Sequence, residues 1–233
     1  MGKFRKEEEL KLRNKKLTNF LFIGFCAVLI IAGLAFAIIK NSNNQSDTTN
    51  KSDLKINSVS SSDWVKGNKE SKIVLVEYSD FQCPACGTYY PLVNQLADEF
   101  KDKIAVVYRH FPLKSIHRNA EPAALAAESA GRQGKFWEMH NALFDNQKEW
   151  SDKINSSEYF IKYAGGLNID VDKFKTDLSS QELKNKVKND LASAEENNLD
   201  HTPTFFLNGK EISPRSYEEF KQIISSEIKK NEQ

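Results

Sequence analysis

The order of hydrophobic and polar positions predicts strands and helices along most of this chain. Residues 72–79 and 103–111 are β-rich and mostly apolar, which predicts two buried strands. Between them, apolar positions repeat at helical spacing from Pro84 onward, so these segments form a β-α-β unit. The pattern is helical from about residue 119 to residue 199, and strand signals return at 204–207. The helical stretch is too long to be a simple connection.

The last part of the chain predicts a hairpin and a final helix. Asn208-Gly209 favours a two-residue turn into a short strand at 210–212. Capping-box patterns at 179–182 and 216–219 predict the starts of a long polar helix and of the final helix. We therefore expect an α/β fold with a mixed sheet, helices on both of its faces, and an inserted helical subdomain at about 114–200.

The N-terminal region has a different pattern, because a basic leader at 1–19 precedes twenty uncharged residues at 20–39. A helix of that length spans about 30 Å and matches the hydrocarbon core of a bilayer. The basic flank predicts a single-pass transmembrane helix in a bacterial cell membrane, with the N-terminus in the cytoplasm. Residues 40–62 are polar and predict a flexible linker to an extracytoplasmic domain at 63–233.

A cleaved signal peptide is the alternative for this segment, since Ala35-Phe36-Ala37 has the small-x-small pattern of a cleavage site. The apolar run continues beyond that site and is long for a signal core, which favours the anchor. Both alternatives export the domain. Cys26 lies inside the predicted span and is interpreted as a small apolar residue there.

Charge and composition argue against three classes of protein: nucleic-acid-binding proteins, disulfide scaffolds and zinc proteins. The net charge of +1 is the sum of +4 on residues 1–19, which hold seven Lys/Arg and three Glu, and −3 on the remainder. A mildly acidic domain argues against nucleic-acid binding, which needs a clustered basic surface. Three cysteines are too few for a disulfide scaffold, and the four histidines show no zinc-site spacing to the Cys pair.

The main chemical signal is Cys83-Pro84-Ala85-Cys86, which stands where a predicted strand gives way to a helix. Two thiols three positions apart on a first helical turn are close enough to form a disulfide. The free N–H groups and the dipole of the helix start favour a thiolate at Cys83, and Cys86 is placed to resolve a mixed disulfide. A purely structural disulfide is the alternative, but so short a loop removes little chain entropy.

Glu77 is a candidate for proton transfer. It lies six residues before Cys83 inside an apolar strand, on the side that alternation assigns to a core layer. A buried acid should have a raised pKa and can exchange a proton with Cys86, directly or through water. The alternative is a carboxylate at a sheet edge that reaches solvent.

Pro203 opens the strand at 204–207, where a proline is often ordinary. A cis bond here would turn the Thr202 backbone toward Cys83 and offer an incoming peptide an edge to pair with. His201 is close in sequence and is a candidate for influencing the Cys83 pKa. We expect substrate to contact Thr202, His201 and the Pro84-Ala85 dipeptide.

The segment Glu77–Cys86 resembles the active-site segment of the DsbA-like thiol–disulfide oxidoreductases. The stretches Tyr108–Leu113, Gly134–Trp137 and Thr202–Gly209 look like further segments typical of that family, in the same order. The similarity covers about residues 63–230 and is far more specific than a lone Cys-x-x-Cys. It implies a thioredoxin fold interrupted by a helical subdomain.

The resemblance also implies roles for four residues: a nucleophilic Cys83, a resolving Cys86, a buried acid at Glu77 and a cis Pro203. The chain departs from the family pattern in two places. The Pro-Ala dipeptide lacks the His beside the second Cys that the best-known strong oxidases have. His201 stands where a small residue is commoner in such proteins.

These features predict a protein-disulfide oxidoreductase that introduces disulfides into exported, unfolded proteins. It needs no cofactor beyond the redox-active disulfide and no metal, and it contacts the bilayer through residues 20–39. The resemblance implies a membrane partner that passes electrons to quinone. The rivals are a reductase or isomerase on the same fold, a non-catalytic holdase, and a copper-delivering redox chaperone, which the presence of only two Met disfavours.

Overall fold

The computed structural model describes residues 56 and 58–232. Its helices and strands follow the predicted order, with two short additions at β1 and α6. The elements are β1 (Trp64–Gly67), β2 (Val74–Ser79), α3 (Pro84–Glu99), β3 (Ala105–His110), α4 (Ala120–Gly131), α5 (Phe136–Asp145), α6 (Gln147–Trp150), α7 (Ser157–Gly166), α8 (Val171–Asp177), α9 (Gln181–Glu196), β4 (Thr204–Leu207), β5 (Lys210–Ile212) and α10 (Tyr217–Asn231).

The described strands form one mixed sheet in the order β1-β3-β2-β4-β5. The β2–β3 pair is parallel, and the other pairs are antiparallel. This confirms the predicted β-α-β unit and C-terminal hairpin. The sequence pattern did not predict β1, because a strand of four residues with three half-buried positions gives a weak periodic signal. The central strand is β2, so its carboxyl end lies in the middle of the sheet edge.

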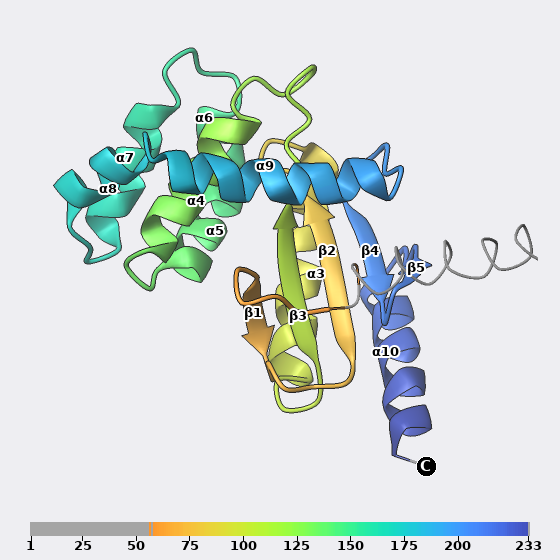
Figure 1. Ribbon diagram of the computed structural model, residues 1–233. Coiled ribbons are helices and arrows are strands. Elements are labelled where there is room, and N and C mark those ends of the chain that lie inside the picture. Colours follow the sequence, from red (N-terminus) through yellow and green to blue (C-terminus); the bar gives the residue numbers. More distant parts are fainter. Residues whose placement is uncertain (1–55, 57, 233) are drawn as a thin grey trace, which may run out of the picture. The chain divides into compact units, whose positions relative to one another are not determined.

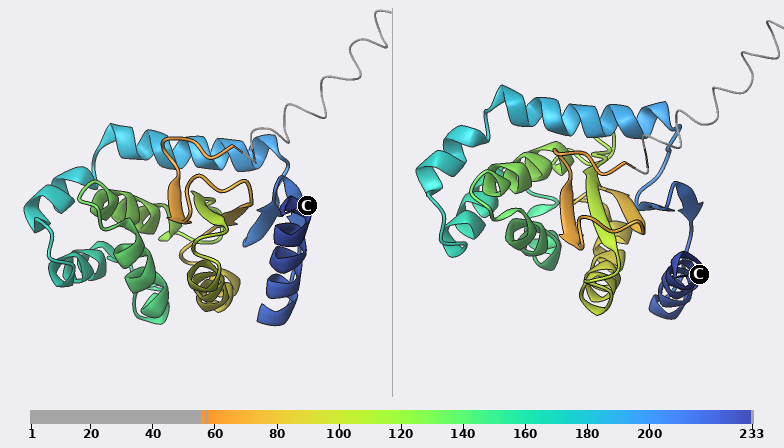
Figure 2. Two further views of the ribbon diagram at one scale, coloured as in Figure 1. Left: turned by 90° about the horizontal axis from the view of Figure 1, so that it is seen from below. Right: turned by 60° about the horizontal axis from the view of Figure 1, so that its bottom comes forward.

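Alternation along β2 divides the core into two layers. Ile73, just before the strand, and Leu75 lie in one buried cluster with side chains of α3 and α10. Val74, Val76 and Tyr78 lie in another cluster with the end of α9. Figure 2 shows the sheet between α9 on one side and α3 and α10 on the other. The prediction of helices on both faces is confirmed.

The helical subdomain packs against one end of the sheet. Its core contains alanines of α4 and large buried side chains of α5–α8, and the same cluster includes Phe81, Cys83 and Cys86. The α9 helix then leaves this subdomain and crosses in front of the sheet (Figure 1). The predicted insertion at about 114–200 is therefore a subdomain for most of its length, and its last helix also covers the sheet.

The two parts meet closely at β1. Trp64 stacks on Phe136 at the start of α5, with ring centroids 4.5 Å apart. A Cβ atom at Gly131 would lie only 2.4 Å from the Trp64 ring, so the end of α4 approaches this ring at a distance that only glycine allows. This contact fixes the helical subdomain beside the sheet.

The two capping-box predictions have different outcomes. Ser216 caps α10, because its hydroxyl accepts a hydrogen bond from the Glu219 N–H at 3.2 Å. The predicted helix start at 179–182 is confirmed, since α9 begins at Gln181 with Ser180 as its N-cap residue, but the Ser180 side chain makes no cap hydrogen bond. Leu183 and Val187, in the first two turns of α9, are buried.

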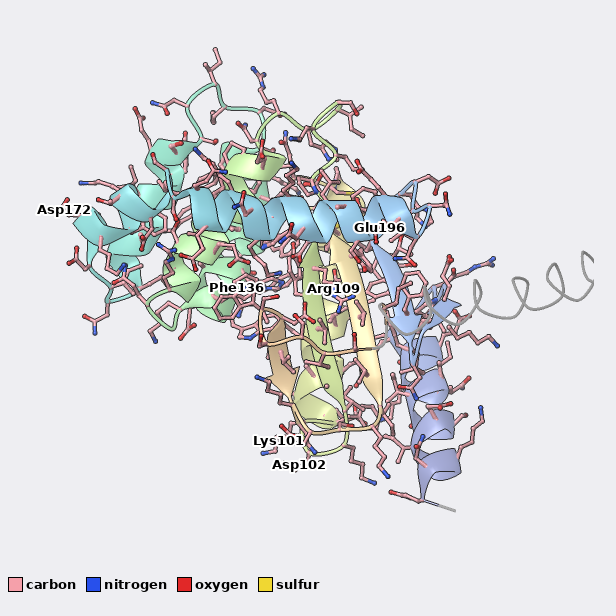
Figure 3. All side chains as sticks on the ribbon, in the orientation of Figure 1. Lys101, Asp102, Arg109, Phe136, Asp172 and Glu196 are labelled. Atoms are coloured by element: carbon pink, nitrogen blue, oxygen red, sulfur yellow. The ribbon has the colours of Figure 1, made fainter. Side chains whose placement is uncertain are left out.

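The packed domain extends into the predicted linker. Ile56 is buried against the sheet, and the Arg109 side chain donates hydrogen bonds to the carbonyl oxygens of Ile56 and Ser58. Arg109 also forms an ion pair with Asp63 at 2.9 Å. Arg109 lies on β3 (Figure 3). The described domain thus reaches Ile56, before the predicted start at residue 63.

The predicted leader at 1–19, the predicted span at 20–39 with Cys26, and the first part of the linker lie outside the described residues. Within the described part of the chain, no helix has the length and apolar character needed to cross a membrane.

Candidate active site

The candidate site lies where the central strand β2 ends and α3 begins. Cys83 is the N-cap residue of α3, with Pro84 at the first helical position, as the sequence predicted. The turn between strand and helix is fixed by Asp80, whose carbonyl oxygen accepts from the Cys83 N–H. The Asp80 carboxylate accepts from the Gln82 N–H at 2.7 Å and lies 2.8 Å from His117 Nδ1. These hydrogen bonds of Asp80 fix the backbone of the turn that carries Cys83.

The two thiols differ in exposure, and both are free. Cys83 is 8% exposed and Cys86 is fully buried, so Cys83 is the more accessible thiol. The Cys86 thiol is the largest influence lowering the pKa of Cys83 to about 5, and Thr202 and the backbone N–H groups of Ala85 and Cys86 also lower it. Burial raises the pKa of Cys86 well above its usual value. The pair therefore holds an acidic outer thiol and a protonated inner thiol.

The Thr202–Pro203 peptide bond is cis, as the resemblance implied. The Cys83 thiol donates to the Thr202 carbonyl oxygen, with 3.4 Å between sulfur and oxygen. The Thr202 hydroxyl is buried and has no hydrogen-bond partner within the described residues. The fold thus brings together residues that lie 119 positions apart in the sequence.

A pocket of about 240 Å³ opens beside this contact. Ala85 and Tyr89 of α3 line one side, and residues 201–205 of the cis-proline segment line another. Thr202, whose carbonyl oxygen accepts from the Cys83 thiol, is one of the lining residues, so the pocket adjoins this contact. Its wall holds three of the predicted substrate-contacting positions, which are Ala85, His201 and Thr202.

His201 does not contact the thiols. Its side chain is 62% exposed, and its Nδ1 atom lies 2.7 Å from the Asp200 carboxylate. The causes that shift the Cys83 pKa do not include His201. The structure therefore gives His201 a place on the pocket wall, and its influence on the Cys83 pKa stays a prediction.

Glu77 is buried on the central strand and is 3% exposed. The alternative of a sheet-edge carboxylate is wrong, because β2 is flanked by β3 and β4. Burial raises the pKa of Glu77 to about 7. No hydrogen bond joins Glu77 directly to Cys86 among the described residues. The Ser79 hydroxyl lies near both groups and partly lowers the pKa of each.

Sequence reasoning missed Ser79 and Tyr108. Both hydroxyl oxygens are buried without a hydrogen-bond partner in the described structure. Burial raises the pKa of Tyr108, and the charges of Glu77 and Cys86 raise it further. Ser79 lies two residues after Glu77 on the same strand face, and alternation would have found it. Tyr108 pairs with Glu77 across strands, which only the register shows.

Gln82 and Gln147 were also missed. Both side chains join the turn before Cys83 to the helical subdomain. Their sequence neighbours give no sign of this, because the partners are 64 to 69 residues apart. Among residues 56 and 58–232, no group of three or more His, Cys, Asp or Glu side chains is placed to hold a metal ion.

A family model described as thioredoxin matches residues 60–226 of this chain. Among curated proteins, the Na(+)/H(+) antiporter NhaA 3 of Salinispora tropica is 37% identical over 148 residues. The aligned region covers 64% of this chain but 22% of the antiporter, so the chain spans about a fifth of that relative's length. The similarity therefore concerns one segment of the antiporter.

Solved structures show the same fold. Oxidised BdbD from Bacillus subtilis is 22% identical with a TM-score of 0.65, and the match covers 72% of this chain and 94% of that one. The alpha-DsbA1 protein of Wolbachia pipientis is 19% identical with a TM-score of 0.68, covering 77% of this chain and 97% of the other. At these identities the likeness shows the fold, including the helical subdomain beside the sheet.

Proposed function

Since this chain belongs to the thioredoxin family and shares the fold of DsbA-like proteins, we propose that it is a thiol–disulfide oxidoreductase that reacts through Cys83 and Cys86. The observation that carries the proposal is the position of the Cys83 sulfur. It lies at a helix start, 3.4 Å from the Thr202 carbonyl oxygen and beside a pocket. A substrate thiolate arriving there meets the more accessible sulfur of the pair.

The direction we propose is oxidation of substrate thiols. A Cys83 pKa of about 5 means that the reduced protein is stabilised as a thiolate at neutral pH. Whatever stabilises the reduced form makes the disulfide a stronger oxidant, by about 30 mV for each 1.4 kcal/mol. The raised pKa of Cys86 keeps the inner thiol protonated in the reduced pair, so the negative charge is held at Cys83.

The reaction balances without a cofactor. A substrate thiolate attacks the Cys83 sulfur, the Cys83–Cys86 bond breaks, and Cys86 leaves and takes up a proton. A second substrate thiolate then attacks the substrate sulfur in the mixed disulfide, which releases Cys83 as a thiolate. Two electrons move from the substrate thiols to the cysteine pair. Glu77, whose pKa of about 7 leaves it partly protonated at neutral pH, is the proposed proton source for Cys86.

The site of action follows from the N-terminal pattern. We place the domain outside the cytoplasm, tethered by residues 20–39, so that its substrates are unfolded proteins as they are exported. Disulfides persist in such oxidising compartments. Each cycle leaves a reduced pair, and a membrane partner linked to quinone is the proposed acceptor of its electrons.

Two cysteine variants of the full chain test this function. Cys83→Ser should reduce oxidation of a reduced test protein to the uncatalysed rate, because the attacked sulfur is gone. Cys86→Ser, mixed with an oxidised test protein that carries a disulfide, should instead accumulate a mixed disulfide: the Cys83 thiolate attacks one sulfur of that disulfide, the other sulfur leaves as a thiolate, and no inner thiol remains to release the bound protein. Mass spectrometry after acid quenching identifies that species. Unchanged oxidation by Cys83→Ser would contradict the proposal.

A further inference from the structure

One side chain of the helical subdomain makes hydrogen bonds to the turn that carries Cys83. Gln147, the first residue of α6, is half-buried and donates from Nε2 to the Phe81 carbonyl oxygen at 2.8 Å. The same Nε2 donates to the Cys83 carbonyl oxygen at 2.9 Å. An amide NH₂ group has two protons, so a single side chain can pair both carbonyl groups at once. The backbone on both sides of Gln82 is therefore tied to α6.

Gln82 completes the connection in the opposite direction. Its Nε2 donates to the Ser151 carbonyl oxygen at 2.8 Å, and its Oε1 accepts from the Asn119 N–H at 2.7 Å. Asn119 Nδ2 also donates to the Ser151 carbonyl oxygen. We call Gln82 and Gln147 together the glutamine clasp. Through it, each of the two parts of the domain holds backbone groups of the other.

The approach of Gln147 to α3 is close. A Cβ atom at Gly87 would lie 2.9 Å from Gln147 Oε1, so the absence of a side chain at Gly87 leaves room for the amide. Gly87 N–H in turn donates to the Cys83 carbonyl oxygen at 3.1 Å. The Cys83 carbonyl group thus receives two donors, one from its own helix and one from the helical subdomain.

We propose that Gln147 is a positioning residue for the nucleophile: from the helical subdomain it fixes the turn that carries Cys83 and thereby sets how readily that thiol ionises. Two physical effects act in the same direction. Donation from Gln147 reduces the partial negative charge on the carbonyl oxygens of Phe81 and Cys83, which would otherwise disfavour a thiolate nearby. Holding the Cys83 carbonyl group also fixes the first helical turn, whose N–H groups face the sulfur.

This inference rests on the proposed function only in that the ionised Cys83 is the group that reacts. Its test measures the ionisation of Cys83 and needs no substrate. Failure of the test would leave the proposed function standing. Conversely, an inactive wild-type protein would refute the function without affecting the proposed role of Gln147.

Three substitutions at Gln147 separate positioning from simple packing. Gln147→Met keeps the volume but cannot donate, so the Cys83 pKa should rise by about one unit, a tenfold loss of thiolate below that pKa. Gln147→Glu should raise the pKa further, since it also places a negative charge beside the turn. Gln147→Lys retains donors and adds a positive charge, so its pKa should be no higher than that of the wild type.

Gln133 supplies a matched control. It is also half-buried in the helical subdomain, and its amide makes two hydrogen bonds to the Asp170 backbone, at 3.0 and 2.9 Å. Asp170 caps α8, at the far end of the subdomain from the turn (Figure 1). Gln133→Met should therefore lower stability by a similar amount and leave the Cys83 pKa unchanged.

The measurement is the rate of Cys83 alkylation as a function of pH in the reduced full chain, with urea unfolding to show that each variant is folded. The Cys83 pKa is expected to be highest in Gln147→Glu, lower in Gln147→Met and lower again in the wild type. In Gln147→Lys it should equal the wild-type value or lie below it. A folded Gln147→Met protein with an unchanged pKa would overturn the inference, as would a Gln133→Met protein with the same shift. If Gln147→Met does not fold, the other two variants decide the matter: a Cys83 pKa that does not rise in Gln147→Glu, or that rises in Gln147→Lys, would overturn the inference.

Discussion

At pH 7 the reduced protein is expected to hold Cys83 almost entirely as a thiolate, with about one thiol remaining in a hundred. This is the largest effect that the site geometry implies, because the pKa falls from a usual value of 9.0 to about 5. The rate of alkylation by iodoacetamide should therefore rise through a midpoint near pH 5 and stay level from about pH 6 upward. Cys86 should remain unmodified in the folded protein, since it is fully buried.

A Cys86→Ala variant serves as the control. The Cys86 thiol is the largest influence that lowers the Cys83 pKa, so its removal should move the alkylation midpoint to a higher pH. The helix start and Thr202 should still hold the midpoint below that of an ordinary thiol. A midpoint near pH 9 in the wild-type protein would mean that the fold does not activate Cys83.

The second large effect concerns Glu77 and stability. Its pKa is raised in the folded state, to about 7 from a usual value of 4.5, because burial penalises the charged form. The folded state therefore binds this proton more tightly than the unfolded state, and stability falls as pH rises from about 4.5 to about 7. The loss corresponds to roughly 3 kcal/mol at pH 8 relative to pH 4.

A Glu77→Gln variant removes this titration. We expect it to be more stable than the wild type by roughly 3 kcal/mol at pH 8, and by much less at pH 4. Urea unfolding of both reduced proteins at the two pH values measures the difference, in which the other carboxyl groups cancel. Glu70→Gln, at an exposed position, is the control and should leave the free energy of unfolding unchanged at both pH values. An equal effect of Glu77→Gln at both pH values would exclude a raised Glu77 pKa.

Sequence patterns were sufficient for most of the architecture. Alternation along residues 73–78 separated the two faces of β2, and Asn208-Gly209 located the β4–β5 hairpin. The Cys83-Pro84 junction indicated the N-cap of α3. These features were predictable because each depends on residues that are neighbours in sequence.

The remaining parts depend on contacts between distant residues. The strand β1 is stabilised by pairing with β3 and by Trp64 packing on Phe136, neither of which a four-residue segment reveals. Ile56 lies in a polar stretch, and its burial depends on the carbonyl groups held by Arg109. The glutamine clasp joins positions 37 to 69 residues apart, so only the folded chain shows it.

The same distinction applies to the site. Cys83, Cys86 and Glu77 are found in one short segment, and their chemistry can be predicted from residue type and spacing. The lowered Cys83 pKa also needs Thr202, which the fold supplies from 119 positions away. Resemblance to a family placed Pro203 beside the thiols, where spacing within this sequence could not.

The most direct test of the account is the equilibrium of the Cys83–Cys86 pair with reduced and oxidised glutathione. Quantifying the thiols by alkylation and mass spectrometry at a series of ratios gives the reduction potential of the pair. The account predicts an intramolecular disulfide with a potential well above the value of about −270 mV that is typical of thioredoxin. A potential at or below that value, or no disulfide between Cys83 and Cys86 at any ratio, would contradict it.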